Sequence, residues 1–491
     1  DNGSVNLGLW KECALACKEI GTSFSIDNKE DFPINRDVTL ESVTNFCKDF
    51  FKNHKVRNKE GQWVPFMPYD YQIMTVYKVL KNRYCLAEVA TSGGKSLIIS
   101  MVYFYTLRNI DPEAKLLLIV PSITLVTQFY NDILTYNYGE NFIHKYENEV
   151  DFRNYDEVKT IFNENPGYLP CDLRVEEIMS DKPRKFKGKN QPNTYIGCYQ
   201  SLDKWPLPFF KQFHTVVVDE SHQAKAETLK KLLKRTFKHS YNRFGVSGTF
   251  PPDDSLEILT IQSLLGPKVN IVEAETLVKL GTITPMDIKV VVLNHNDKEF
   301  NDRMKWIKKN GNGKEVYQFE KEYVQSSQKR IDFISKLVSK CDDNTLILFH
   351  NIEHGQKILN NLVPIHKDKE FLYISGDIKN KEREEIKAKM EVNEDVVKVL
   401  IATYGTLSTG VSIKNIHNII FIDSFKSESL VIQSIGRGLR KLDGKDKATI
   451  FDIVDVFDGN KMDNILYKQF KEREKFYINR KYPYKITKIN I

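Results

Sequence analysis

The chain has 491 residues, of which 41% are hydrophobic and 28% are charged, and this balance excludes a wholly disordered protein. Its 72 basic and 65 acidic residues give a formal net charge of +7, which over this length is weak evidence for a nucleic-acid partner. The longest apolar run, near 115–126, is too short and too interrupted by Pro121, Ser122 and Thr124 to cross a membrane. The length predicts two or three domains.

Cysteine usage indicates the compartment. The seven cysteines form no Cys-x-x-Cys pair, so neither a disulfide framework nor a zinc ribbon is predicted. We therefore expect a cytoplasmic protein. The sequence begins at Asp1 and not at methionine, so whether residues precede it stays open.

The N-terminal residues, 1–65, are expected to form a small α+β accessory segment. Apolar spacing predicts helices over Leu9–Ile20 and Thr39–Phe51. The polar, basic stretch 53–61 is expected to be a linker.

Residues 66–255 alternate helices with short apolar strands, which predicts a doubly wound parallel sheet. Within them, 141–191 is a polar insertion with a basic run at 182–189, interpreted as a solvated loop, with nucleic-acid contact as the minority alternative. The strands are predicted at Tyr84–Val89, Lys115–Val120, Thr194–Gly197, Thr215–Val218 and Phe244–Ser247.

The same architecture is predicted a second time in residues 331–460. A connector and surface excursion is expected over 256–330, and a helical, basic tail over 461–491. The second set of strands is predicted at Thr345–His350, Glu370–Ile374, Val397–Ala402, Asn418–Ile422 and Ala448–Asp452.

A glycine-rich loop follows the predicted strand Tyr84–Val89 and precedes a helical run, Leu97–Leu107. Backbone N–H groups at a helix N-terminus bind phosphate, so Lys95 is expected to reach the β- and γ-phosphates of ATP and Ser96 to hold Mg²⁺. Val89 stands where the usual pattern begins with glycine, and an ordinary turn is the alternative for this loop taken alone. The nucleotide-binding residues predicted in this loop are Thr91, Ser92, Gly93, Gly94, Lys95 and Ser96.

Two adjacent carboxylates end the apolar strand Val216–Val218. Alternation along a strand sends Asp219 and Glu220 opposite ways, so they can do different jobs. We expect Asp219 to bind Mg²⁺ and Glu220 to orient and deprotonate the attacking water. A solvent-facing acidic strand end is the alternative, which the upstream loop disfavours.

Positive charge for the transition state is predicted in the second half. On a helix, Gln433, Arg437 and Arg440 lie at i, i+4 and i+7 and share one face. Two guanidinium groups on one face suit a γ-phosphate, whereas a surface helix with salt bridges is the alternative.

With these three segments in order, the chain resembles superfamily-2 helicases over roughly residues 66–460, and most closely the UvsW helicases of T-even-like bacteriophages. The resemblance implies an α/β fold with two tandem RecA-like doubly wound parallel-sheet lobes and a small N-terminal α+β accessory segment. The segments most similar to the UvsW helicases are Thr91–Ser96, Thr403–Asn415 and Gln433–Lys441.

The resemblance also assigns roles outside the phosphate site. Tyr71 and Gln72 match the adenine-recognition motif, although Tyr69 replaces the arginine often found there. Gln433 is implied in nucleotide binding, and His222, Ser247 and Thr249 in coupling hydrolysis to movement. The implied nucleic-acid contacts are Ser122, Gln128, Gln200, Ser201, His350, Thr403 and Ser408.

The function so implied is an ATP-dependent helicase that uses Mg²⁺ and remodels branched DNA such as forks, Holliday junctions and R-loops. Its partners would be single-stranded and branched DNA, with RNA in hybrids left open. If the protein is encoded by a phage, it would act in the host cytoplasm. No membrane partner is expected, and the oligomeric state stays open. A duplex-tracking DNA translocase without strand separation is the alternative. A non-catalytic clamp is disfavoured, because Lys95, Glu220 and Arg437 are all present.

Overall fold

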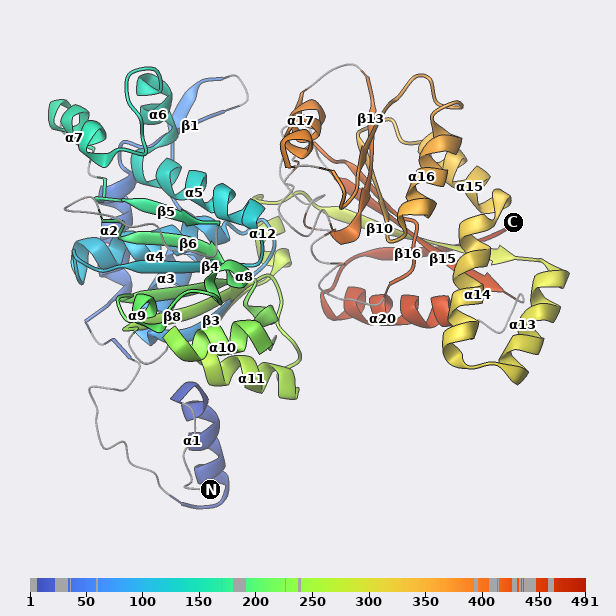
Figure 1. Cartoon of the computed structure of the whole chain (residues 1–491), viewed down its shortest axis with the longest axis horizontal. Coiled ribbons are helices and arrows are strands. Elements are labelled where there is room, and N and C mark those ends of the chain that lie inside the picture. Colours follow the sequence, from blue (N-terminus) through green and yellow to red (C-terminus); the bar gives the residue numbers. More distant parts are fainter. Residues whose placement is uncertain are drawn as a thin grey trace. The chain divides into compact units, whose positions relative to one another are not determined.

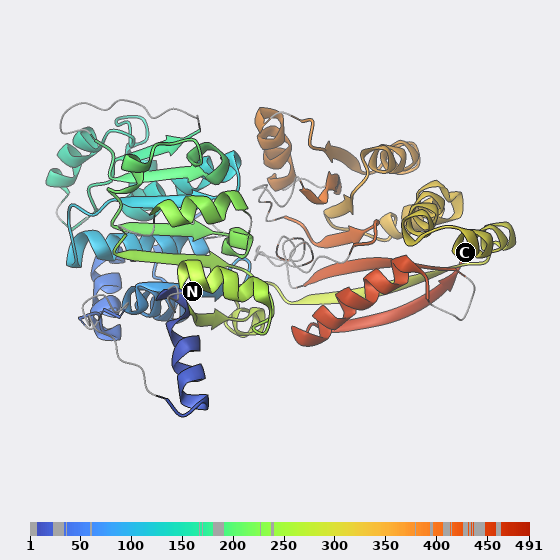
Figure 2. The same ribbon diagram turned by 60° about the horizontal axis from the view of Figure 1, so that its bottom comes forward.

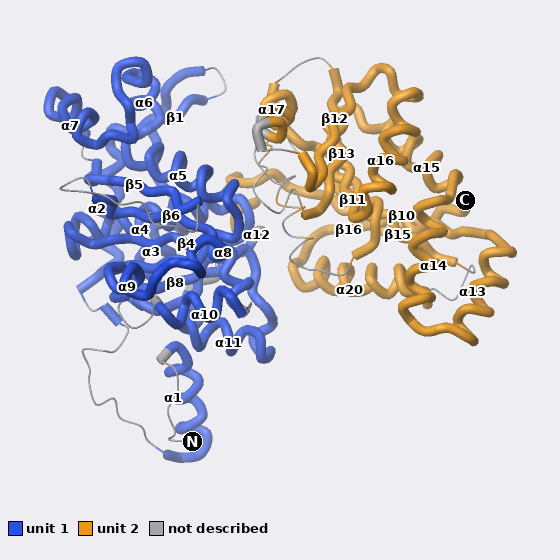
Figure 3. Tube along the Cα trace, in the orientation of Figure 1, with its two compact units in different colours: residues 1–274 blue, residues 275–491 orange. Residues whose placement is uncertain are grey.

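The structure is a computed structural model of the whole chain. It describes residues 7–22, 34–35, 37–58, 61–165, 167–168, 170–179, 191–225, 227–236, 240–378, 380–392, 396–405, 413, 415–425, 431, 434, 436, 447–457 and 463–491. The chain divides into two compact units, Asp1–Ala274 and Glu275–Ile491 (Figure 3). The basic run at 182–189 lies outside the described residues.

The first unit is built on a seven-stranded sheet in the order β5-β6-β4-β7-β8-β3-β9, with every pairing parallel. Every residue of β4, β6, β7 and β8 is buried, which explains why the sequence shows continuous apolar runs and not alternation. The strands are β3 (Tyr84–Val89), β4 (Leu116–Val120), β5 (Val175–Ile178), β6 (Thr194–Cys198), β7 (Thr215–Asp219), β8 (Asn242–Ser247) and β9 (Lys268–Val272).

Helices cover both faces of this sheet (Figures 1 and 2). One face packs with the helices α8 to α11 into a core that includes Leu117, Val216 and Phe210. The other face carries α3, α4 and α5, which contact one another. The helices are α3 (Asp70–Asn82), α4 (Lys95–Asn109), α5 (Ile123–Tyr138), α6 (Glu140–Tyr146), α7 (Tyr155–Glu164), α8 (Tyr199–Leu202), α9 (Leu207–Phe210), α10 (Glu227–Thr236) and α11 (Leu256–Leu265), and α12 (Ala274–Lys279) begins at the last residue of this unit.

The N-terminal segment covers α4. Every residue of α4 from Leu97 to Leu107 is buried, because α2 (Leu40–Phe51) packs on the side of α4 that the sheet does not reach. Phe50 of α2 stacks on Phe104 with ring centroids 5.1 Å apart, and Ser42 Oγ lies 2.8 Å from the Tyr105 hydroxyl.

Both N-terminal helices are present as predicted, α1 (Trp10–Glu19) after the short 3₁₀ turn η1 (Leu7–Leu9), and α2. The stretch expected to be a linker instead contains β1 (Lys55–Arg57), which pairs antiparallel with β2 (Trp63–Pro65). The Arg57 guanidinium lies over the Trp63 ring, 4.9 Å from its centroid, a cross-strand contact that the local polarity of the sequence hides.

The second unit repeats the architecture with a seven-stranded parallel sheet in the order β12-β13-β11-β14-β15-β10-β16. Its strands are β10 (Met286–His295), β11 (Thr345–Phe349), β12 (Glu370–Ile374), β13 (Lys398–Thr403), β14 (Asn418–Phe421), β15 (Ala448–Phe457) and β16 (Tyr484–Asn490). Its helices are α13 (Lys298–Asn310), α14 (Gly313–Ser326), α15 (Gln328–Val338), α16 (Ile352–Leu362), α17 (Asn380–Glu391) and α20 (Ile465–Asn479).

The predicted fold class is confirmed: two parallel-sheet lobes follow a small α+β segment, and all strands predicted in both lobes are present. The interpretation of the insertion 141–191 as a solvated loop is wrong for its described residues, because they form most of α6, all of α7 and the edge strand β5, and they bury Phe142 and Phe162. The structure adds three further strands where connector or tail was expected. β9 joins the first sheet through β3, while β10 and β16 pair with each other in the second. Among the described helices, none combines the length and the apolar character needed for a membrane crossing.

Removing the Phe50 side chain should destabilise the first unit. Phe50 is 2% exposed and stacks on Phe104, so Phe50→Ala should lower the free energy of unfolding by about 3–5 kcal/mol. Leu15→Ala on α1, where Leu15 is 62% exposed, is the control and should change it by less than about 0.5 kcal/mol. Denaturant unfolding of both variants measures this, and equal small losses would mean that α2 does not support α4.

Candidate active site

The glycine-rich loop joins β3 to α4 and adopts the conformation that its glycines permit. Gly94, the N-cap residue of α4, has φ 77° and ψ 41°, and a Cβ there would lie 2.3 Å from Gln72 Nε2. Ser92 also has a positive φ, of 65°. No side chain in the described structure caps α4, so its first N–H groups suit an anion such as phosphate.

A buried ion cluster lies next to this loop. Lys95, the first residue of α4, donates to Glu220 Oε1 at 2.5 Å, and its Nζ lies 3.9 Å from Asp219 Oδ1. Asp219 is the last residue of β7, and Glu220 follows it with φ 47°, a left-handed conformation that is rare for a residue with a side chain. The structure therefore brings together Lys95 with both predicted catalytic carboxylates.

The pKa values of the two carboxylates are shifted in opposite directions. Burial raises the pKa of Asp219, and the nearby Glu220 charge adds to this, whereas Lys95 lowers it only in part. Burial would also raise the pKa of Glu220, but Lys95 and His222 outweigh it and hold that pKa well below the usual range. A lowered pKa favours the ionised form of Glu220, which is the form that a general base must take.

One carboxylate oxygen of the cluster lacks a hydrogen bond. Asp219 is 6% exposed, and among the described residues its buried Oδ1 accepts none. Ser96, in the first turn of α4, offers a hydroxyl that lies 3.3 Å from the Tyr136 hydroxyl. A buried, unbonded carboxylate oxygen and a hydroxyl are hard oxygen donors of the kind that Mg²⁺ accepts.

Two of the residues expected to couple hydrolysis to movement, His222 and Ser247, contact Glu220. His222 Nδ1 lies 3.3 Å from Glu220 Oε2 and 2.9 Å from the Ser247 hydroxyl at the end of β8. The Ser247 hydroxyl donates to the Thr249 carbonyl at 2.7 Å. A change at Glu220 is therefore one contact away from the segment after β8.

Tyr71 and Gln72 form hydrogen bonds with the glycine-rich loop. The Tyr71 hydroxyl and Gln72 Nε2 both donate to the Gly93 carbonyl, at 3.1 and 3.2 Å, and Gln72 Oε1 accepts the Tyr69 N–H at 2.9 Å. Gln72 is 4% exposed. Both side chains thus lie at the loop, and the amide of Gln72 is engaged with the protein in this structure.

The residues of the first unit that are predicted to contact nucleic acid lie at the same sheet edge. Ser122 follows β4 and caps α5, accepting the Leu125 N–H at 3.4 Å, and Gln128 lies further along α5. Gln200 and Ser201 follow β6, where Gln200 is exposed and Ser201 is buried with its hydroxyl 3.2 Å from Cys198 Sγ. Because β4 and β6 are parallel neighbours, their carboxyl ends place both motifs together.

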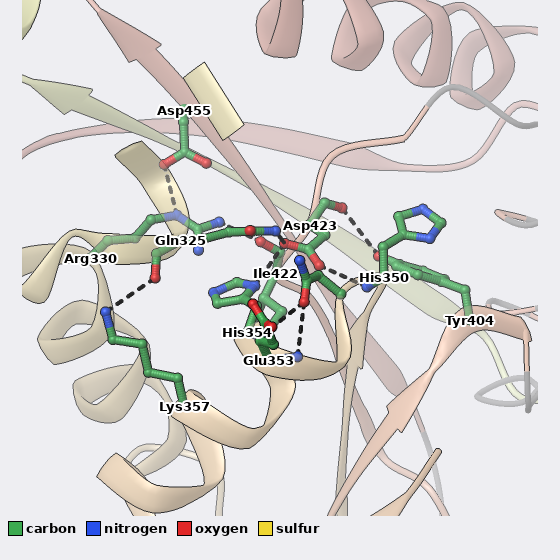
Figure 4. Close-up of polar contacts among 11 residues, drawn as sticks. Gln325, Arg330, His350, Glu353, His354, Lys357, Tyr404, Ile422, Asp423 and Asp455 are labelled. Carbon is green, nitrogen blue, oxygen red and sulfur yellow. Dashed lines mark hydrogen bonds and ion pairs between the residues drawn. The ribbon is translucent and has the colours of Figure 1, made fainter. Parts of the chain in front are cut away.

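In the second unit, a buried carboxylate organises the corresponding motifs (Figure 4). Asp423 accepts the His350 backbone N–H at 2.7 Å and lies 2.8 Å from His354 Nδ1. Tyr404, which follows Thr403 at the end of β13, donates to the Asp423 carbonyl at 3.3 Å, and its ring lies 4.6 Å from that of His350. Asp423 therefore holds the residues after β11 against those after β13.

Some predicted residues lie outside the described part of the chain: Ser408, Gln433, Arg437 and Arg440. Sequence reasoning also missed two contacts that the structure shows, Tyr136 beside Ser96 and Asp423 between His350 and Tyr404. The signal for Asp423 was its position, because it closely follows the strand Asn418–Phe421 as Asp219 ends its own strand.

Two family models match the chain in the two units. Residues 65–252 match the family described as "Type III restriction enzyme, res subunit", and residues 329–441 match "Helicase conserved C-terminal domain". The first match spans the loop, the carboxylate pair and the segment around Ser247. The second spans His350, Thr403 and the segment 433–440, which carries Arg437 and Arg440.

Comparison with individual proteins agrees. The chain is 29% identical over 391 residues to the ATP-dependent DNA helicase uvsW of Enterobacteria phage T4, covering 79% of this chain and 68% of that protein. The ATP-dependent Type ISP restriction-modification enzyme LlaBIII bound to DNA has a TM-score of 0.58 at 15% identity, over 88% of this chain and 32% of that one. Dbp5 of S. cerevisiae bound to RNA and ADP BeF3 has a TM-score of 0.50 at 14% identity, over 86% and 90%. These structures share the fold.

Replacing Glu220 should separate nucleotide binding from hydrolysis. Glu220→Gln removes the base but keeps a side chain of the same size beside Lys95, so ATP binding should remain while turnover falls by roughly 10²–10⁴-fold. Lys95→Ala should weaken ATP binding itself. Nucleotide-binding titrations and steady-state ATPase assays measure both effects, with Glu113→Gln on the surface as the control. Wild-type turnover in Glu220→Gln would remove the general-base role.

Proposed function

We propose that this chain, which is a superfamily-2 helicase similar to the UvsW helicases of T-even-like bacteriophages, uses ATP hydrolysis to remodel branched DNA. That it is an ATP-dependent helicase acting on nucleic acid is the premise, and branched DNA is the proposal. The observation that supports ATP hydrolysis is the cluster of Lys95, Asp219 and Glu220 beside a phosphate-type loop, whereas branched DNA rests on the similarity to the UvsW helicases.

In the proposed mechanism, the ATP phosphates lie on the N–H groups at the start of α4, and Lys95 leaves Glu220 to contact the β- and γ-phosphates. Mg²⁺ would neutralise phosphate charge, held by Ser96 and by the unbonded oxygen of Asp219. Glu220 then orients the attacking water and takes its proton. The adenine would be recognised by Tyr71 and Gln72, as the family resemblance implies.

The second unit would complete the site. We propose that Gln433, Arg437 and Arg440 reach the γ-phosphate when the lobes close, so that the transition-state charge is stabilised only in the closed state. The network from Glu220 through His222 to Ser247 and Thr249 would report the state of the phosphate.

Movement along the strand would come from two grips on the phosphodiester backbone. The first grip would use Ser122, Gln128, Gln200 and Ser201, and the second His350, Thr403 and Ser408. Hydroxyl, amide and backbone contacts to phosphate are independent of base sequence, so the grips suit any strand. Closing and opening around ATP would change the spacing between them. We propose the host cytoplasm as the setting, supported by the likeness to a phage protein.

A duplex-tracking translocase is the second candidate, favoured by the match to the restriction-enzyme family model. Such a motor shares every motif of the ATP site but does not separate strands. The substrate, and not the ATP site, therefore distinguishes the two proposals.

Branched DNA should be the preferred substrate. We expect the wild-type chain to migrate a four-way junction and to regress a fork, with ATPase stimulation by forked and single-stranded DNA exceeding that by blunt duplex. ATPase assays across single-stranded, duplex and forked DNA and RNA, together with gel-based junction migration, measure this. Stimulation by blunt duplex alone, without strand exchange, would support the translocase instead.

Removing an arginine of the second lobe should stop turnover without preventing binding. Arg437→Ala should leave ATP affinity nearly intact and reduce turnover by on the order of 10³-fold or more, as for other arginines that stabilise the transition state. Lys367→Ala, an exposed side chain of the same lobe, is the control. Turnover near wild type in Arg437→Ala would mean that the first lobe hydrolyses ATP alone.

A further inference from the structure

The helices α13 and α14 form a hairpin at the edge of the second unit, outside its sheet (Figures 1 and 2). Phe300 of α13 stacks on Phe319 of α14 with ring centroids 4.9 Å apart and nearly parallel planes, and it contacts Phe457 of β15 at 4.5 Å. Asp297 begins α13, accepting the Phe300 N–H at 3.0 Å, and Asn312 and Glu315 form a capping box that begins α14.

The base of the hairpin is fixed to the rest of the unit. Glu320 of α14 is fully buried and accepts the backbone N–H groups of Ile465 and Leu466, the first residues of α20, at 3.1 and 3.0 Å. The Tyr323 hydroxyl donates to Asp297 at 3.1 Å. These contacts make the hairpin a rigid projection, so a side chain on its outer surface is held in place.

The outer surface of α13 carries an exposed indole. Phe300, Met304 and Ile307 face the hairpin core, whereas Trp306 points away from it and is 65% exposed. Its exposed basic neighbours one turn away are Arg303, whose guanidinium also lies 5.2 Å from the centroid of the Phe319 ring, and Lys309, and the exposed Asp302 lies one turn away as well. We call Arg303, Trp306 and Lys309 the Trp306 face.

The charge around the Trp306 face is mainly positive. Residues 303–314 contain five cations, Arg303, Lys305, Lys308, Lys309 and Lys314, and no carboxylate. Two of these cations are paired with acids outside the range, Lys305 with Asp302 at 3.1 Å and Lys308 with Asp463 at 3.5 Å. A single exposed apolar side chain needs no explanation by itself. An exposed indole on a rigid helix within a mainly basic stretch matches the composition of surfaces that stack nucleobases and contact phosphates.

We propose that the Trp306 face is an accessory DNA-binding site, in which the indole stacks on an unpaired base next to a branch point and Arg303 and Lys309 contact the flanking phosphates. The site deepens the proposed function and rests on it, because it supplies a contact to a second DNA arm. A protein partner is the alternative use of such a face, and it predicts no effect on DNA affinity.

The test compares variants of the full chain. Trp306→Ala should raise the DNA concentration that half-saturates the ATPase with a fork bearing single-stranded arms by about tenfold, with maximal turnover unchanged. Trp306→Phe keeps an aromatic ring and should recover most of the affinity. Ile365→Ala, which removes a side chain of similar exposure (63%) in the same unit, is the control and should have no effect.

Charge and fluorescence give independent readouts. Lys309→Glu should weaken fork binding and flatten its salt dependence by about one unit of slope, whereas Lys367→Glu, the matched control on the same unit, should not. The quenching of intrinsic fluorescence by an oligonucleotide should be smaller in Trp306→Phe than in the wild type.

The proposal is overturned if Trp306→Ala binds the fork as tightly as the wild type, which would leave the face to a protein partner. It is also overturned if Trp306→Phe is as defective as Trp306→Ala, or if the loss is equal for blunt duplex, because stacking on an unpaired base would then be excluded. A wild-type chain that binds forks but does not migrate junctions would contradict the proposed function, while these binding comparisons would still decide the role of Trp306.

Discussion

The active site depends on one buried ammonium group held between two carboxylates. Asp219 and Glu220 end a fully buried strand, where an unpaired charge would be costly, and Lys95 compensates them from the first turn of α4. For Lys95 to reach Glu220, α4 must begin at that residue, and the loop before it must take the left-handed conformations seen at Ser92 and Gly94. The same ion pair fits the proposed mechanism, in which a phosphate that attracts Lys95 would release Glu220 to act on water.

The second unit also contains a buried carboxylate, and different residues stabilise its charge. Asp423 lies just beyond β14 and is 6% exposed, and burial would raise its pKa. Its contacts with His354 and with the His350 backbone N–H outweigh burial and keep its pKa well below the usual range. In both units a strand leads to a buried aspartate at the carboxyl edge of the sheet. Asp423 accepts the backbone N–H of His350, which follows β11, the parallel neighbour of β14, whereas Asp219 lies next to Lys95 at the loop after β3. This shared geometry positions the residues proposed to grip the backbone.

Local sequence predicted the central strands of both sheets because each is an uninterrupted apolar run. It did not predict β16, an edge strand whose lysines alternate with apolar residues and whose side chains are mostly exposed, so that its pairing with β10 is not written in either segment alone. The role of Asp423 was hidden for the same reason, since its partners His354 and His350 lie 69 and 73 residues away in sequence. The Lys95 cluster could be predicted, because the glycine-rich loop before Lys95 and the carboxylate pair Asp219 and Glu220 at the end of a strand are both short local motifs.

Preference for a branch point cannot come from the two proposed backbone grips alone. Contacts to phosphate through hydroxyls and N–H groups bind every single strand alike, whether or not a junction is near. An additional contact must therefore be held in a fixed position on one of the lobes. It must also recognise a feature of DNA that continuous duplex lacks. An unpaired base exposes a π-face that duplex hides by stacking, and Trp306 offers a matching surface on a hairpin whose position is fixed through Glu320 and α20. Because the indole has few rotatable bonds and the hairpin is rigid, little conformational entropy is lost on binding, so even one stacked base can bias the motor toward a junction.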